Sequence, residues 1–394
     1  MKTHSRHINL SRMAAACAAL ACAPAFAQSS VTLYGAVDDA VTYVSNQKGS
    51  SNVYLRQGNL YASKFGLQGK EDLGGGTTAI FDLQNGFDLN TGAFASSGVM
   101  FNREAYVGLQ NVRAGTLTAG RQYTPYYMFV GPLTGSAWLT GATGAHPGDI
   151  DGLDTTVRIN SSLVYTSPNW SGLQASAMYA LGGIAGSTGK GQTYSAAVRY
   201  LNGPMTLALG YLRMDNAQQT AGFDPASTGS FGTSALNAGY VSAKAIQHIA
   251  AAGNYTLGNL TLGLSYSNVE YQAGARSLFA STAVFNTYAA LAVYRFTPAF
   301  DAGAGVAYTA ASKANGINSA ARYQQYSLKE AYHLSKRTTL YALEAYQHAG
   351  GQTLGSGGAG NIVDAAPAVG DSQNGTPSST RSQFVGMVGI ATLF

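Results

Sequence analysis

Hydrophobic and polar residues alternate with a period of two over many short stretches of this chain. In the stretch 260–266 every even position is Leu or Tyr, and every odd position is Thr, Gly or Ser. The stretches 205–211 and 300–308 alternate in a similar way. Because successive side chains of a strand point to opposite faces, the pattern predicts β-strands with one apolar and one polar face.

The connections between these strands alternate between short and long. Short ones, rich in the turn formers Gly, Asn and Pro, lie at 72–76, 111–115, 168–171, 202–204, 257–259, 297–298 and 334–337. Longer polar stretches lie around 45–52, 89–99, 124–157, 182–191, 215–243, 272–283, 311–319 and 349–380. Seven turns and eight loops imply sixteen strands with both chain ends on the turn side. That asymmetry is typical of an antiparallel transmembrane β-barrel with short periplasmic turns and long extracellular loops.

The last strand, 381–394, is apolar and ends on an aromatic residue. Val388, Ile390 and Phe394 share one face. A soluble fold rarely leaves such an edge exposed, whereas a closed membrane barrel pairs both edges and buries one face in lipid. We therefore predict that Phe394 is an assembly signal for the outer-membrane assembly machinery.

The N-terminus reads as a secretory signal peptide over residues 1–27. Three basic residues precede the apolar stretch 13–23, and Ala25-Phe26-Ala27 supplies a cleavage site. The expected mature chain, 28–394, is then one barrel domain. Cleavage leaves 20 Lys+Arg against 18 Asp+Glu, so the net charge falls from +5 to +2 and does not indicate nucleic acid. Cys22 could instead mark a lipoprotein, but the usual leucine three residues before it is missing.

Composition favours the outer membrane over a soluble compartment. Charged residues make up 10% of the chain, against roughly 25% in soluble domains. The mature sequence nevertheless lacks the ~20 consecutive apolar residues of a membrane helix. The alternative, a multi-domain soluble β protein, would be expected to carry more charge.

Six motifs resemble the Gram-negative general porins of the beta-proteobacterial type. They are Ser30-Val-Thr-Leu-Tyr-Gly35, the stretch 63–76 that begins Ser-Lys-Phe-Gly, Asn102-Arg-Glu-Ala-Tyr-Val-Gly-Leu109, Gly120-Arg-Gln-Tyr123, Val164-Tyr-Thr-Ser-Pro168 and Leu334-Ser-Lys-Arg-Thr338. The resemblance covers essentially the whole mature chain. It implies a homotrimer of sixteen-stranded barrels in outer-membrane lipid, each with its third loop folded inward to narrow an aqueous pore.

The chain departs from that family in two places. Lys64 stands where the family commonly has Arg, which keeps a positive charge but loses the guanidinium fork. The chain ends Ala391-Thr-Leu-Phe394, where the family often ends in a basic residue, any residue and Phe. Less charge at that end leaves Phe394 as the main assembly signal.

The resemblance identifies the long loop 124–157 as the constriction loop. This loop contains no Lys or Arg but holds Asp149, Asp151 and Asp154, next to His146. Strand alternation places Lys64 on the polar face with Gln68, and Arg158 on the face of Asn160 and Ser162, while the family pattern places Arg103 inward beside Ala105. The predicted pore constriction comprises six residues: Lys64, Arg103, Arg158, Asp149, Asp151 and Asp154.

Acid on the loop facing base on the wall would produce a transverse field across the pore. The alternative is that these charges are merely solvated loop and rim residues. Arg121 shares the face of Leu117 and Ala119, so we expect it to pin a loop or a subunit contact rather than to line the pore.

Signals for catalysis fail on inspection. The stretch 183–190 resembles a phosphate loop, but its spacing is one residue too long and Gly191 replaces the required hydroxyl residue. The mature histidines show no metal-ligand spacing, and no nucleophile elbow precedes a helix. The sequence therefore predicts no catalytic, cofactor or metal residues. Its first hypothesis is a passive channel for small hydrophilic solutes and ions, weakly selective for anions; the alternatives are a barrel enzyme and an adhesin or structural barrel.

Overall fold

The computed structural model describes residues 30–217, 234, 236–371 and 376–394 of the chain. The expected signal peptide, 1–27, lies outside the described residues. The strands are β1 (Ser30–Gln47), β2 (Ser50–Gln57), β3 (Lys64–Gly74), β4 (Thr77–Gly86), β5 (Glu104–Asn111), β6 (Gly115–Tyr123), β7 (Arg158–Thr166), β8 (Leu173–Ala180), β9 (Thr193–Asn202), β10 (Met205–Asp215), β11 (Ala245–Leu257), β12 (Leu260–Gln272), β13 (Ala283–Thr297), β14 (Phe300–Ala311), β15 (Arg322–His333), β16 (Thr338–Gly350), β17 (Gln352–Gly355), β18 (Gly358–Asp364) and β19 (Ser382–Leu393).

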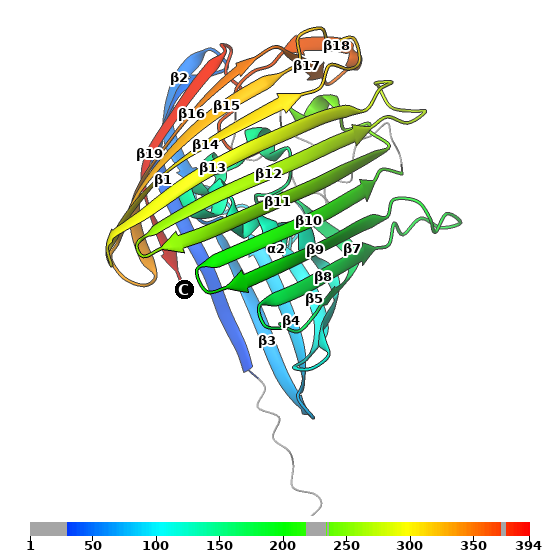
Figure 1. The fold of residues 1–394 in the computed structure, drawn as a ribbon, viewed down its shortest axis with the longest axis vertical. Coiled ribbons are helices and arrows are strands. Elements are labelled where there is room, and N and C mark those ends of the chain that lie inside the picture. The colour runs from blue at the N-terminus through cyan, green and yellow to red at the C-terminus, as the bar shows by residue number, and fades with distance from the viewer. Residues whose placement is uncertain (1–29, 218–233, 235, 372–375) are drawn as a thin grey trace, which may run out of the picture.

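These strands form a closed antiparallel barrel (Figure 1). Strand β19 pairs with β16 on one side and with β1 on the other, which closes the ring. The long strand β1 pairs with β2 along its second half and with β3 along its first half. Since β2 and β3 share one position and the β17–β18 hairpin stands apart, the barrel has sixteen positions, which confirms the predicted fold.

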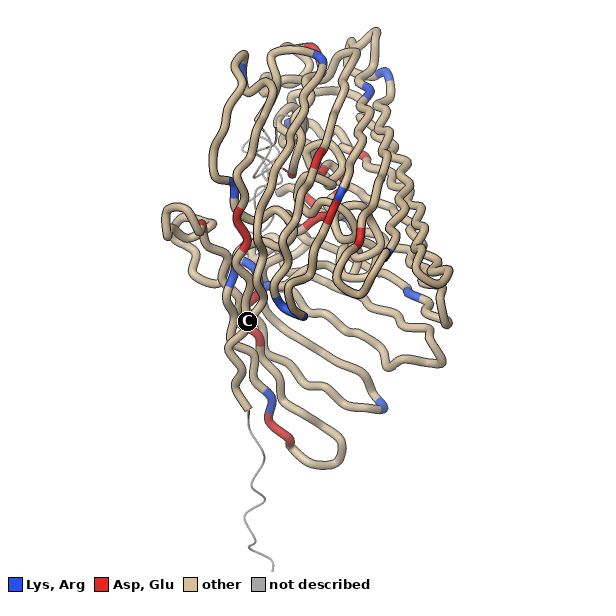
Figure 2. The backbone as a smooth tube through the Cα atoms, turned by 90° about the vertical axis from the view of Figure 1, so that its left-hand side faces the viewer, with Lys and Arg blue, Asp and Glu red and all other residues tan. Residues whose placement is uncertain are grey.

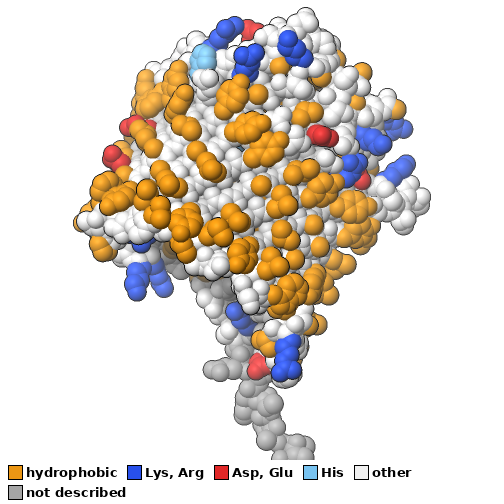
Figure 3. All heavy atoms as spheres, in the orientation of Figure 1, with side chains coloured by type: hydrophobic (Ala, Val, Ile, Leu, Met, Phe, Trp, Pro, Cys, Tyr) orange, Lys and Arg blue, Asp and Glu red, His pale blue; other side chains and the backbone are white. Residues whose placement is uncertain are grey.

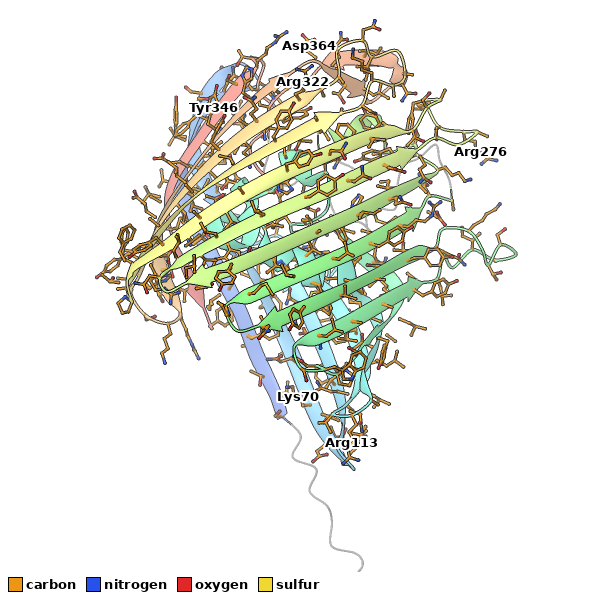
Figure 4. The ribbon with its side chains drawn as sticks, in the orientation of Figure 1. Lys70, Arg113, Arg276, Arg322, Tyr346 and Asp364 are labelled. Atoms are coloured by element: carbon orange, nitrogen blue, oxygen red, sulfur yellow. The ribbon has the colours of Figure 1, made fainter. Side chains whose placement is uncertain are left out.

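The alternation of the sequence maps onto the two faces of the wall. On β12, Leu262 and Leu264 are exposed on the outside, while Thr261 and Ser267 are buried on the inside. Figure 3 shows hydrophobic side chains spread over the outer wall in this view, with most of the charged side chains toward its ends. In Figure 4, Lys70 and Arg113 lie at the turn end and Arg276 and Arg322 at the loop end. The closed ladder satisfies the backbone hydrogen bonds that an apolar solvent could not satisfy.

Few charged residues are exposed on the outer wall (Figure 2), and Glu330 of β15 and Glu344 of β16 are two of them. Glu344 lies in the middle of β16, exposed on the outer face between Leu340 and Tyr346. Its neighbours across the ladder are Leu328 and Gly386. This carboxylate therefore sits in the apolar band of the barrel.

The predicted turns and loops fall between the barrel strands as expected, with two differences. The predicted loop 349–380 contains the hairpin β17–β18. Residues 45–52, expected to be a loop, form the ends of β1 and β2 around a tight turn at Lys48 and Gly49. Beyond the apolar band neither face of a strand needs hydrophobic residues. The alternation therefore disappears from the sequence although the ladder continues.

The third loop folds inside the barrel and contains α2 (Pro125–Val130), η1 (Gly131–Leu133), η2 (Ser136–Thr140), η3 (Gly141–Gly144) and η4 (Pro147–Asp149). A further short helix, η6 (Asn237–Gly239), lies in the fifth loop. Helix α2 begins with the Thr124 hydroxyl accepting from Tyr127 N–H (3.1 Å) and with Pro125 in its first turn. It packs on β9, β10 and β11, and η2 packs on β13 to β16. The inward third loop implied by the resemblance is confirmed. Within residues 30–217, 234, 236–371 and 376–394, no helix is both long and apolar enough to cross a membrane.

Residues 58–63, between β2 and β3, form a bracket that connects the wall to loop 3. The buried Asp38 carboxylate accepts from the N–H groups of Leu60 (2.6 Å) and Tyr61 (2.8 Å) and from the Tyr341 hydroxyl. The carbonyl oxygen of Asn59 accepts from Ala142 N–H at 3.0 Å. The position of loop 3 is therefore set by the wall through this bracket.

Gly141 allows this close approach, so replacing it should displace loop 3. Its φ is +51°, and a Cβ there would overlap the Asn59 carbonyl oxygen. We expect Gly141→Ala to push the loop off the bracket, because overpacking in a fitted contact costs about 1–3 kcal/mol. The variant should show noisier single-channel currents and altered conductance in planar bilayers.

Gly183→Ala is the matched control for this substitution. Gly183 also has a positive φ (+64°), but nothing lies within 4 Å of the added atom. It should behave as the unmodified protein in the same recordings. Identical traces from both variants would show that the bracket does not position loop 3.

Candidate functional site: the lumen at loop 3

A cavity of about 970 Å³ lies between loop 3 and the wall around β2, β3 and β4. Loop 2, which connects β4 to β5, and loop 8, which connects β16 to β19, complete its lining. The charged residues that line it are Arg56, Lys64, Asp88, Arg103, Asp154 and Asp371. Both signs of charge therefore face one space at the level where loop 3 crosses the barrel.

Arg103 reaches this space from the bend before β5. Its Nε donates to Gln84 Oε1 at 2.8 Å, and Gln84 Nε2 donates to the Tyr34 hydroxyl at 2.8 Å. Ala105, beside which the family pattern places Arg103, instead pairs with Leu83 on the outer face. Glu104 is the first residue of β5 and its side chain points inward. Arg103 precedes the regular strand, so alternation does not apply to it, and its side chain can also point inward.

Lys64 is the first residue of β3 and lines the cavity. It lies on the same face as Gln68, as alternation predicts, and opposite Gly86 in the ladder. Over the residues with assigned positions we find no hydrogen bond or ion pair for its ammonium group. Its charge is therefore available to solutes in the cavity.

Arg158 lies behind this lining, against Tyr123. Its Nε donates to the Tyr123 hydroxyl at 3.2 Å, and only 2% of the residue is exposed. Alternation placed Arg158 on the face of Ser162, but the β6–β7 register shifts between Gly120 and Gln122. Ser161 has a φ of +50° at this bulge. The extra residue reverses which face the residues before it occupy. Arg158 therefore lies opposite Tyr123 in the ladder and not on the face of Ser162.

The three loop carboxylates occupy different places. Asp154 lines the cavity, whereas Asp149 and Asp151 are fully buried and do not. Asp149 accepts from the Thr156 hydroxyl and from Asp154 N–H (3.0 Å). The expectation that all three face the lumen therefore differs from the structure for Asp149 and Asp151.

Asp151 instead attaches loop 3 to the wall. It contacts His146 Nδ1 at 2.6 Å and accepts from the Ser267 hydroxyl of β12 at 2.5 Å. Gly148 and Gly152, both with positive φ, turn this part of the loop back on itself and direct the two carboxylates away from the lumen.

Burial governs the protonation of these loop groups. It raises the pKa of Asp154 to about 7, and the nearby Asp371 adds to the effect. Burial, with the neighbouring Asp154, also raises the pKa of Asp149 well above its usual range. Burial alone would raise the pKa of Asp151, but the partner His146 outweighs it and lowers that pKa. Asp151 in turn raises the pKa of His146 despite its burial. The pairing therefore favours the charged forms of both His146 and Asp151, while Asp154 titrates near neutral pH.

Sequence reasoning missed Asp371 and Arg56 in this lining. Asp371 belongs to loop 8, whose segment 365–369 docks inside the barrel with Ala365 and Val369 buried. The run Ala365-Ala-Pro-Ala-Val369 is apolar within an otherwise polar loop. That break in composition is the signal that could have predicted a docked segment.

Arg121 agrees with the expectation that it pins a neighbouring segment. Its Nε donates to the Asn102 carbonyl oxygen at 2.8 Å, and Nη1 donates to Asn160 Oδ1 at 2.6 Å. These contacts tie the end of loop 2 to β7.

Comparison with known proteins gives consistent matches. The family profile described as "Gram-negative porin" matches residues 14–352. An outer membrane porin protein of Bordetella pertussis is 30% identical over 50% of this chain and 57% of its own length. Outer membrane porin protein 32 of Delftia acidovorans is 34% identical over 49% and 56%. The chain thus matches little more than half the length of these two relatives.

Solved structures match over nearly the whole barrel. An anion-selective porin from Comamonas acidovorans superposes with a TM-score of 0.68 and 23% identity, over 93% of this chain and 100% of that one. The trimer form of OmpT from Vibrio cholerae gives 0.63 and 14%, over 93% and 99%. At these identities the likeness concerns the fold.

Proposed function

Because the chain belongs to the Gram-negative porin family, we propose that it forms a water-filled channel of the outer membrane for passive diffusion of small hydrophilic solutes and ions. The observation that carries this proposal is the cavity lined by charges of both signs where loop 3 crosses the closed barrel. A low-charge outer wall supports contact with lipid. No cofactor or chemical step is part of the proposed mechanism.

We further propose a weak preference for anions. Lys64 and Arg103 present positive charge to the cavity, while Asp149 and Asp151 are buried behind loop 3. Asp154 is only partly ionised at neutral pH because its pKa is raised to about 7. The description of the Comamonas structure as anion-selective agrees with this direction.

Within the described part of the barrel, Ser267, His146 and Asp151 form a Ser/His/Asp cluster. Its geometry gives little support to the alternative of a barrel enzyme. Ser267 donates to Asp151 and not to a histidine, and His146 and Asp151 are buried. A hydrolase needs a nucleophile hydrogen-bonded to its base and open to substrate. This arrangement instead attaches loop 3 to the wall.

Conductance of the purified protein in a planar bilayer tests the proposal. We expect stepwise ohmic currents, and a reversal potential in a potassium chloride gradient that reports faster chloride permeation. A protein that inserts without conducting would favour the adhesin or structural alternative.

We propose a homotrimer, as the family resemblance implies. Protein that is extracted in mild detergent and not boiled should run as a heat-modifiable trimer on a detergent gel. Closed rings of like subunits are the common form of soluble homo-oligomers, and the same symmetry argument applies here. Light scattering that gives a monomer mass under mild extraction would contradict this prediction.

Selectivity should depend on pH through Asp154. A carboxyl with a pKa of about 7 is charged above that pH and neutral below it. Lowering the pH from 8 to 6 therefore removes most of one negative charge from the cavity. The chloride-to-potassium permeability ratio should rise up to roughly fourfold, because a full charge is worth about 1 kcal/mol in water. Asp154→Asn should show the higher ratio already at pH 8 and should change less between the two pH values than the unmodified protein. A ratio that rises equally in Asp154→Asn would assign the titration to another group.

A further inference from the structure

We propose that Tyr123 is the positioning residue that holds the guanidinium groups of Arg103 and Arg158 in place and joins them to loop 3. The inference rests on the proposed channel function and deepens it. Tyr123 is the last residue of β6 and directly precedes Thr124, the N-cap of α2. It therefore stands where the wall becomes the constriction loop.

Both guanidinium groups lie over the Tyr123 ring. The Arg103 Cζ is 5.8 Å from the ring centroid, and the Arg158 Cζ is 5.3 Å from it. An aromatic face attracts a cation at such distances, and the attraction grows as water is excluded. Here Tyr123 is 7% exposed and the two arginines 4% and 2%. One buried ring thus contacts two cations.

The contact of both guanidinium groups with one ring offsets the repulsion between their positive charges. Two guanidinium groups so close to one ring repel each other, and long side chains would move apart into the cavity if nothing held them. The ring attracts both, the Tyr123 hydroxyl accepts from Arg158 Nε (3.2 Å), and Gln84 accepts from Arg103 Nε. Each arginine is thereby fixed at Nε. The terminal nitrogens of Arg103, which lines the cavity, remain for solutes, whereas Arg158 stays buried behind the lining.

The same ring connects the basic groups to loop 3. The Tyr127 ring, in the first turn of α2, lies 4.9 Å from the Tyr123 ring at an interplanar angle of 37°. Tyr127 also lines the cavity. The aromatic pair therefore fixes the distance between the basic side of the lumen and the loop that carries Asp154.

A merely structural role for Tyr123 would make a different prediction. If the ring only filled space, leucine would serve nearly as well, and any defect would appear as reduced stability. If Tyr123 positions the arginines, its ring and its hydroxyl have separate effects. Tyr123→Phe keeps the ring contact with both cations and loses only the hydroxyl, whereas Tyr123→Leu loses the ring contact and the hydroxyl.

The test measures reversal potentials of the trimeric protein in a tenfold potassium chloride gradient, for the unmodified protein, Tyr123→Phe, Tyr123→Leu and Arg103→Gln. Tyr123→Leu should lose at least half of the selectivity that Arg103→Gln removes. Tyr123→Phe should keep most of it. Tyr323→Leu is the control, since that buried tyrosine of β15 contacts no guanidinium group in the described chain; it should match the unmodified protein.

Reaction with phenylglyoxal, followed by peptide mass spectrometry, gives a second measurement on the same proteins. Arg158 should react at least threefold faster in both Tyr123 variants because the hydroxyl no longer holds its Nε. Arg103 should react faster only in Tyr123→Leu. Should Tyr123→Leu fail to assemble, Tyr123→Phe still decides, since unchanged reactivity of Arg158 in it would overturn the inference.

Two outcomes separate this inference from the proposed function. If Arg103→Gln moves the reversal potential and Tyr123→Leu does not, Tyr123 has no positioning role while the channel proposal stands. If the unmodified protein shows no anion preference and Arg103→Gln changes nothing, the proposed selectivity fails and the inference fails with it.

Discussion

Replacing Phe394 by aspartate should reduce the folded protein recovered from the outer membrane at least tenfold. Phe394 N–H donates to the Gly35 carbonyl oxygen (3.1 Å), and Gly35 N–H donates to the Phe394 carbonyl oxygen (2.9 Å). These bonds complete the ladder between β19 and β1, and the Phe394 ring lies against Gly35, where a Cβ would overlap it. A charge there would face an apolar surface, and a barrel that cannot close leaves an unpaired edge in lipid. Heat-modifiable mobility of outer-membrane fractions measures the result.

Two further variants separate closure of the barrel from recognition of the terminal residue. Phe394→Tyr keeps an aromatic end and should assemble normally. Gly35→Ala keeps Phe394 but displaces its ring, so it should lower the yield if packing at the closure matters. Normal yield of Phe394→Asp would contradict both roles.

Neutralising single charges in the cavity should move selectivity in opposite directions. We expect Arg103→Gln to shift the reversal potential toward cations and Asp154→Asn to shift it toward anions. Each change should alter the permeability ratio up to roughly fivefold, because a charge about 4 Å from a permeating ion is worth about 1 kcal/mol in water. The shifts should be larger at 0.01 M than at 1 M salt, where the Debye length falls from about 30 Å to 3 Å.

Asp151→Asn is the informative control for that pair. It removes the same charge as Asp154→Asn, but from a carboxylate that is buried against His146 and Ser267. We expect it to loosen loop 3 and to increase current noise rather than to shift the reversal potential as Asp154→Asn does. Equal shifts from both aspartate variants would mean that Asp151 also faces the pore.

The barrel could be predicted because its wall is built from local patterns. Leu262 and Leu264 face outward and Thr261 inward by strand geometry alone, and turn residues set the connections. Lys64 followed the same rule. Arg158 did not, because the bulge at Ser161 changes the parity, and a bulge leaves no mark in hydrophobic alternation.

The arrangement of loop 3 could not be predicted because distant residues determine it. Gln325 Nε2 donates to the carbonyl oxygens of Thr143 (3.1 Å) and Ala145 (2.9 Å). Asp38 holds the bracket on which Gly141 rests. Asp149, Asp151 and Asp154 look equivalent in the sequence, but in the folded chain Asp149 is buried within loop 3 and Asp151 against β12, while Asp154 lines the cavity. The family resemblance predicted the inward loop, but not which carboxylate reaches the cavity.

Glu344 has a consequence for the side on which subunits of the proposed trimer would meet. A carboxylate in the middle of a hydrocarbon layer is unfavourable, so a single barrel surrounded by lipid carries a penalty on its β16 face. Packing of that face against a neighbouring subunit would remove Glu344 from lipid and let it accept hydrogen bonds from the neighbour. The cost of exposing this one side chain would then oppose dissociation of the complex within the membrane. A residue that is unfavourable for the lone barrel would in this way favour the assembled one.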